Sequence, residues 1–188
     1  MKRLILLVAA SLILASPAFA WKEKVYRIEW SEWGLKDGMK TEQIAKQLDK
    51  NNVKYHKYNM RYNNYPFENA HFMIDTVSRW GITWDKVVIR THRNILADVY
   101  YSRIYKDKDI AMEIAAILKM YFEEKCGFSM DYTNLDLFDG VMYSKYLHYS
   151  TDLYIPHYFS ISVCKDISNA GYKLDIDIHS YDYNPWLM

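Results

Sequence analysis

The residues best suited to chemistry lie near the C-terminus, in the alternating segment Asp175-x-Asp177-x-His179. If this segment is a strand, the three side chains share one face, and successive ones lie about 7 Å apart. Two carboxylates and one imidazole suit a hard or borderline divalent metal ion. We therefore predict a candidate metal site at Asp175, Asp177 and His179, which are also the polar residues that a small hydrolase could use. The alternative is an ordinary solvated strand face.

Other polar clusters match known chemical motifs less well. The segment 131–139 carries several oxygen ligands, but their spacing misses the EF-hand loop. No two of the six histidines stand four residues apart. The sequence lacks a nucleophile elbow, a zinc-protease helix, a phosphate-binding loop and a dinucleotide fingerprint. It therefore predicts no cofactor and no catalytic residue of a common enzyme class.

The unusual feature of the composition is its 18 tyrosines and 6 tryptophans. Tyrosine and tryptophan are favoured at protein interfaces, because each gives a large contact area with a polar end and few rotors to freeze. They also stack on sugars. Four tyrosines share one stretch with polar spacers, which makes their complete burial implausible. We predict this group as the binding site: Tyr55, Tyr58, Tyr62 and Tyr65. The alternative is a tyrosine-rich core.

The first twenty residues have the pattern of an export signal. A short basic start, Met1-Lys2-Arg3, precedes an apolar run that is too short to span a bilayer, and Ala18-Phe19-Ala20 suits signal peptidase. We predict cleavage after Ala20, a single domain over 21–188, no later membrane span and a periplasmic or secreted protein. Without Lys2 and Arg3 the charge is 22 − 23 = −1, which argues against nucleic-acid binding.

Export would favour pairing of the two cysteines. Cys126 and Cys164 both follow the predicted cleavage point, and an oxidising compartment stabilises disulfides. We predict a disulfide between them. One difficulty is that Cys164 has the opposite strand parity to the apolar residues Phe159, Ile161 and Val163, so the bond would need a bulge or the end of the strand.

The sequence predicts a helix followed by several strands, and this pattern occurs twice along the chain. Apolar spacing predicts a helix from Thr41, as N-cap, to about Asn51-Asn52, and a longer one from Asp107 or Asp109 to Cys126-Gly127. We expect 54–66 to be a loop or an irregular edge strand and 131–139 to be a loop. Strands are predicted over 71–74, 86–91, 95–105, 141–149, 158–164 and 172–179. The sum is an α+β domain of two similar halves, with two helices on one face of an antiparallel sheet.

A short segment carries a family resemblance. Gly38, Met39, Gln43 and Ile44 resemble the helix start of the β-lactamase inhibitor protein and outer-membrane assembly lipoprotein superfamily, although the threonine is one place late and no lipobox is present. The layout is also similar to small exported bacterial proteins of unknown function. Either resemblance implies a two-layer α+β fold that binds protein through its sheet or loops, without catalysis.

These observations favour a non-enzymatic module that binds another exported or envelope protein, as an inhibitor, an immunity-type factor or an assembly accessory. A binder of glycan or another small ligand through the same aromatic side chains is the first alternative. A small hydrolase is the second.

Overall fold

The computed structural model describes residues 32–36, 38–60, 69–146, 158–166, 168 and 170–179. The predicted signal and cleavage point lie outside these residues, as do Tyr62 and Tyr65. In the described part, no helix combines the length and apolar character that a membrane crossing requires.

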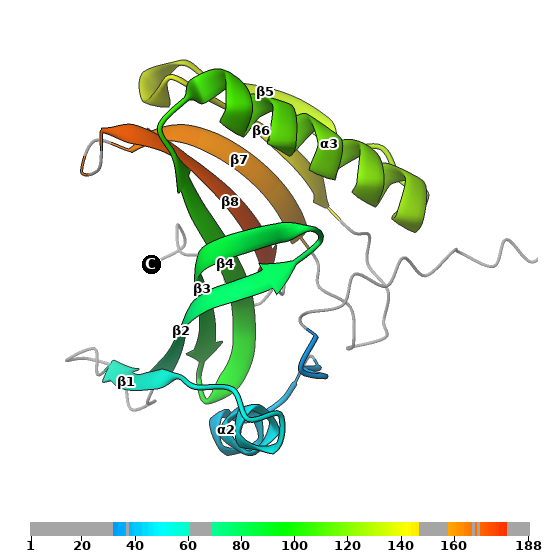
Figure 1. Cartoon of the computed structure of the whole chain (residues 1–188). Helices are drawn as coiled ribbons and strands as arrows, with labels where there is room; N and C mark the ends of the chain where they lie inside the picture. Colours follow the sequence, from blue (N-terminus) through cyan, green and yellow to red (C-terminus); the bar gives the residue numbers. More distant parts are fainter. Residues whose placement is uncertain are drawn as a thin grey trace, which may run out of the picture.

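The described residues form one antiparallel sheet of eight strands, in the order β1-β2-β3-β4-β8-β7-β6-β5 (Figure 1). Two α-helices accompany the sheet, α2 (Thr41–Lys50) and α3 (Lys108–Cys126), which confirms the α+β class. The strands are β1 His56–Met60, β2 Asn69–Arg79, β3 Ile82–His92, β4 Ile95–Tyr105, β5 Asp131–Leu135, β6 Gly140–Tyr146, β7 Tyr158–Asp166 and β8 Gly171–His179.

The topology repeats once along the chain. In each half, a helix precedes four consecutive strands that pair in sequence order: α2 with β1 to β4, and α3 with β5 to β8. The last strands of the two halves, β4 and β8, pair with each other, so the halves share one continuous curved sheet (Figure 1). The predicted two similar halves are therefore present as one domain-wide sheet.

Local signals explain both helices. Before α2, the side chain of Gln43 accepts a hydrogen bond from the Lys40 amide at 2.8 Å, so the N-cap is Lys40 and the prediction of Thr41 is wrong by one residue. The Asp107 carboxylate caps α3 by accepting the amides of Asp109 and Ile110. Gly127 ends α3 in the left-handed conformation, at φ 70°.

The core follows from strand alternation. One register row crosses five strands and consists of fully buried apolar side chains: Phe72, Ile89, Val99, Ile178 and Phe159. Both helices lie on this face. Phe122 of α3 packs on Phe159 with ring centroids 4.6 Å apart, and the α2 residue Thr41 donates a hydrogen bond to Thr91. The neighbouring residue on each strand must point to the other face, on which neither of the described helices lies; we term it the helix-free face.

This alternation overturns the predicted disulfide. Cys126 and Cys164 are both free, and Cys126 is buried at the end of α3 on the helix-covered side. Val163 is buried on that same side, so the next residue, Cys164, points to the helix-free face. The sheet thus separates the two sulfurs. The opposite strand parity of Cys164, noted from the sequence, therefore already argued against the disulfide.

Two further expectations are corrected. The segment 131–139 is not a loop, because 131–135 pair with β6 as the edge strand β5, and Asp136–Phe138 form a 3₁₀ turn, η1. The strand expected at 71–74 extends over Asn69–Arg79, because its exposed second half pairs with β3.

Candidate functional site

The helix-free face of the sheet carries a charged row. Arg90 on β3, Asp98 on β4, His179 on β8 and Tyr158 on β7 are direct cross-strand neighbours. Arg90 Nε lies 2.5 Å from Asp98 Oδ1, and the side chain of Asp98 is only 1% exposed. The rings of Tyr158 and His179 are 4.5 Å apart. Residues distant in sequence therefore meet in one polar cluster.

Three carboxylates of this cluster are shielded from water. Burial raises the pKa of Asp98 to about 7, and the nearby charge of Asp177 adds to the shift while Arg90 opposes it. Burial also raises the pKa of Asp175 and Asp177. Lys173 Nζ lies 3.1 Å from Asp175 Oδ2. Asp98 is thus paired with an arginine and Asp175 with a lysine. Asp177 has no lysine or arginine nitrogen within 4.0 Å among the described residues.

The predicted metal residues Asp175, Asp177 and His179 occupy one face of β8, as alternation required. They remain spread along the strand at about 7 Å per step, too far apart for all three to reach one ion. Among the described residues, no three His, Cys, Asp or Glu side chains are grouped to hold a metal ion. Asp175 is instead engaged by Lys173.

Sequence reasoning missed Asp98 and Arg90, the innermost ion pair of the cluster. A signal for Asp98 was present, because this acid interrupts the apolar run of β4 between Ala97 and Val99. A buried acid in an apolar strand needs a partner. Its partner on β3 became visible only with the strand register.

The predicted tyrosine site does not form one surface in the described residues. Tyr55 packs its ring against Phe72 at 5.4 Å, on the helix-covered side, and its hydroxyl lies 3.1 Å from Asp49 Oδ1. Tyr58 is 49% exposed on the edge strand β1 and pairs with His71, on the helix-free face. Tyr55 and Tyr58 therefore serve opposite sides of the sheet.

A row of exposed apolar side chains lies on α3. Its buried residues, from Ala111 to Cys126, face the sheet. On the opposite side of the helix run five exposed residues at alternating spacings of three and four, which we term the outer stripe: Ile110, Glu113, Ile117, Met120 and Glu124. The three apolar members are 49%, 58% and 67% exposed, respectively. A surface helix normally carries polar residues there.

The surface continues at the turn between β5 and β6. Leu137 is 94% exposed and Phe138 is 58% exposed; we term these two residues the η1 tip. The tip is anchored behind by Asp139, which pairs with Lys108 at the start of α3 and accepts the Tyr172 hydroxyl at 3.0 Å. The exposed side chains therefore project from a fixed turn near the beginning of the outer stripe.

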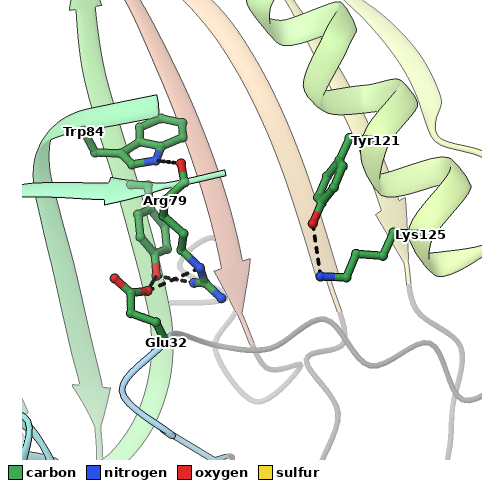
Figure 2. Close-up of polar contacts among 6 residues, drawn as sticks. Glu32, Arg79, Trp84, Tyr121 and Lys125 are labelled. Carbon is green, nitrogen blue, oxygen red and sulfur yellow. Dashed lines mark hydrogen bonds and ion pairs between the residues drawn. The ribbon is translucent and has the colours of Figure 1, made fainter. Parts of the chain in front are cut away.

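Aromatic packing holds α3 in place. Trp80, at the β2–β3 turn, lies 5.1 Å from Phe122 of α3. The Arg79 guanidinium stacks on Trp80 at 4.2 Å and lies 3.3 Å from Glu32. Trp84 Nε1 donates to the Arg79 carbonyl at 3.2 Å (Figure 2). The β2–β3 hairpin thus packs against the inner side of α3 through Trp80, while the outer stripe is exposed to solvent.

One flank of the outer stripe is aromatic. Tyr121 is 40% exposed, and Lys125 donates a hydrogen bond to its hydroxyl at 3.1 Å (Figure 2). This hydrogen bond joins the side chains of Tyr121 and Lys125 to each other, and Ile117 stays exposed beside them.

Comparison with protein families, curated proteins and solved structures finds no match. None of these comparisons bears on the resemblance to the inhibitor and lipoprotein superfamily. The resemblance itself stays a prediction.

Proposed function

We propose that this protein is a binding module that docks a partner protein on the outer stripe of α3 and the adjacent η1 tip. The observation that carries the proposal is a helix with apolar residues on both sides, of which only one packs against its own sheet. Ile117 and Met120 are 58% and 67% exposed on the other side. Large apolar side chains that cluster on a surface mark interaction sites.

The pattern of the stripe suits a helical partner. Spacings of three and four residues place side chains along one seam, as in helix–helix packing. Glu113 and Glu124 lie in the same seam, and neither has an ion pair among the described residues. A complementary partner helix would carry apolar residues opposite Ile117 and Met120, and Lys or Arg opposite the two glutamates.

The compartment in which the partner would be met is predicted from the N-terminal sequence. The predicted signal would deliver the protein to the periplasm or the medium, so we propose that the partner is an exported or envelope protein. An inhibitor, an immunity-type factor and an assembly accessory all fit this mode of binding.

The test is photo-crosslinking from the stripe in host envelope extract. A photoreactive phenylalanine analogue at Met120 should give one crosslinked species, and the same analogue at Lys46 on the surface of α2 should not. The species should disappear in the variant Ile117→Lys. Burying an isoleucine contributes about 1.5–3 kcal/mol, so its loss should weaken binding more than tenfold.

The matched control is Ile95→Lys, because Ile95 is a comparably exposed isoleucine at the start of β4 and forms a β-bridge with Lys40, the N-cap of α2. This variant should retain the crosslink, and both variants should unfold like the wild-type protein. Equal crosslinking from Met120 and Lys46, or a crosslink that survives Ile117→Lys, would sink the proposal.

A further inference from the structure

A second site is built into the helix-free face, away from α3. Two buried carboxylate oxygens there, Asp98 Oδ2 and Asp177 Oδ1, have no hydrogen-bond partner among the described residues. An unpaired buried acceptor costs free energy, and more so when it is charged. The cluster therefore lacks a donor at this place.

The two carboxylates are close neighbours. Asp98 pairs with His179 and Tyr100 pairs with Asp177, so Asp98 and Asp177 are diagonal neighbours on adjacent strands, with Cβ atoms about 7 Å apart. Two charge-assisted hydrogen bonds of about 2.8 Å span up to roughly 5.6 Å between the oxygens. One nitrogen atom bridges both side chains if their free oxygens turn toward each other to within this span.

Charge also points to a cation. Arg90 is paired with Asp98 and Lys173 with Asp175, whereas Asp177 has no lysine or arginine paired with it among the described residues; His179 and Arg90 are the positive charges that act on it. Tyr100 stands beside it and has Arg90 and Lys173 over its ring, at 5.8 and 5.5 Å. Aromatic rings beside carboxylates favour organic cations, and no three His, Cys, Asp or Glu side chains of the described residues are grouped to hold a metal ion.

We propose that the helix-free face binds a primary ammonium group between Asp98 and Asp177. The nitrogen donates one hydrogen bond to each free oxygen, and its positive charge balances Asp177. Asp177 is half-buried and the two oxygens are buried, so the ammonium group must displace the side chains that cover them in order to bind. The ammonium belongs to a small free amine or to a lysine side chain. This site is independent of the α3 surface.

The test is a titration of the isotopically labelled protein with n-butylammonium chloride, followed by amide NMR at constant ionic strength. We expect saturable shifts at Asp98, Tyr100 and Asp177. Tetramethylammonium has the same charge but no N–H donor, so it should bind at least about tenfold more weakly. Asp177→Asn should weaken butylammonium binding by at least about tenfold.

The matched control is Asp75→Asn, which removes an exposed carboxylate on β2 of the same sheet and should leave the affinity unchanged within about twofold. Absence of saturation would overturn the proposal and would mean that a water molecule or a shared proton fills the gap. So would equal binding of tetramethylammonium, or undiminished binding in Asp177→Asn.

If Asp177→Asn does not fold, the carboxyl ¹³C signals of the wild-type protein decide. The signals of Asp98 and Asp177 should both move on saturation, and two unmoved signals would overturn the proposal. Nα-acetyl-lysine methylamide identifies the source. Binding at least tenfold tighter than butylammonium indicates a lysine side chain, and equal or weaker binding indicates a free amine.

Discussion

At the scale of single residues, Asp98 shows how burial within a β-strand changes the ionisation of a carboxylate. Its side chain is 1% exposed, and the ion pair with Arg90 offsets only part of the cost of removing its charge from water. The result is a carboxyl group whose pKa lies at about 7, close to neutral pH. Such a group couples folding to pH.

The sign of this coupling is testable. The folded pKa of about 7 exceeds the unfolded value of about 3.9, so the folded protein binds more protons between these limits. The contribution of Asp98 to stability is therefore complete below about pH 4 and is lost as the pH rises to 7. Asp98→Asn should remove a slope of up to about 1.4 kcal/mol per pH unit in this window.

Urea unfolding at pH 4.5, 5.5, 6.5 and 7.5 measures that slope. Asp98→Asn also leaves Arg90 without its carboxylate, which shifts the free energy of unfolding at all four pH values, so the slope rather than the level is compared. Asp175 and Asp177 remain in both proteins. The control Asp75→Asn should keep the wild-type slope. Parallel wild-type and Asp98→Asn curves would contradict the assignment.

At the scale of elements, the ends of α3 are set by two residues with separate physical roles. Asp107 accepts the amides of Asp109 and Ile110 at 2.8 and 3.4 Å, and Gly127 adopts φ 70°. These ends place the outer stripe and hold Phe122 against the sheet. The helix is thus positioned by local capping as well as by its apolar face.

Loss of the cap has a defined cost. Asp107→Ala removes the only side-chain acceptor at the first turn of α3 among the described residues and should lower the free energy of unfolding by about 1 kcal/mol. Asp107→Asn keeps an oxygen at the same place and should retain most of the stability. Urea unfolding of the two variants measures the difference. An equal loss in both would indicate that charge, not capping, is responsible.

At the scale of the whole molecule, the two halves share a sheet and a core. The junction of β4 and β8 places Val99 beside Ile178, so the buried row runs from Phe72 in the first half to Phe159 in the second without interruption. Neither half can unfold without exposing apolar side chains of the other. The repeat in topology therefore divides neither the sheet nor the buried row.

This continuity predicts one unfolding transition. Phe72→Ala in the first half and Phe159→Ala in the second should each lower the free energy of unfolding by about 3–5 kcal/mol and shift a single transition. Tryptophan fluorescence reports mainly on the first half, whereas far-ultraviolet circular dichroism reports on both. Transitions that separate in either variant would show that the halves unfold independently.

Much of the fold could be predicted wherever the deciding signal is local. The helix Lys108–Cys126 ends where Asp107 and Gly127 indicated, and β4 has its predicted bounds, Ile95–Tyr105. The gap between the predicted strands 86–91 and 95–105 contains the β3–β4 turn, where Arg93 and Asn94 both have positive φ. Capping, turn chemistry and alternation act within a few residues, so one sequence suffices to detect them.

Features that depend on a partner strand escaped prediction. The edge strand β5 has exposed residues without alternation, and only its pairing with β6 makes it a strand. The disulfide prediction treated Cys126 and Cys164 as free to meet, whereas the sheet lies between them. Compartment chemistry alone could not reveal that barrier.

The α+β class, the capped helix α3 and the common face of Asp175, Asp177 and His179 could be derived from the sequence, because each follows from periodicity or capping signals along the chain. That Arg90 and Asp98 lie on the same face, and that the outer stripe of α3 is exposed, became visible only in the folded protein. Strand order and helix docking bring together residues that are distant in the chain. Their contacts are therefore invisible to any local pattern.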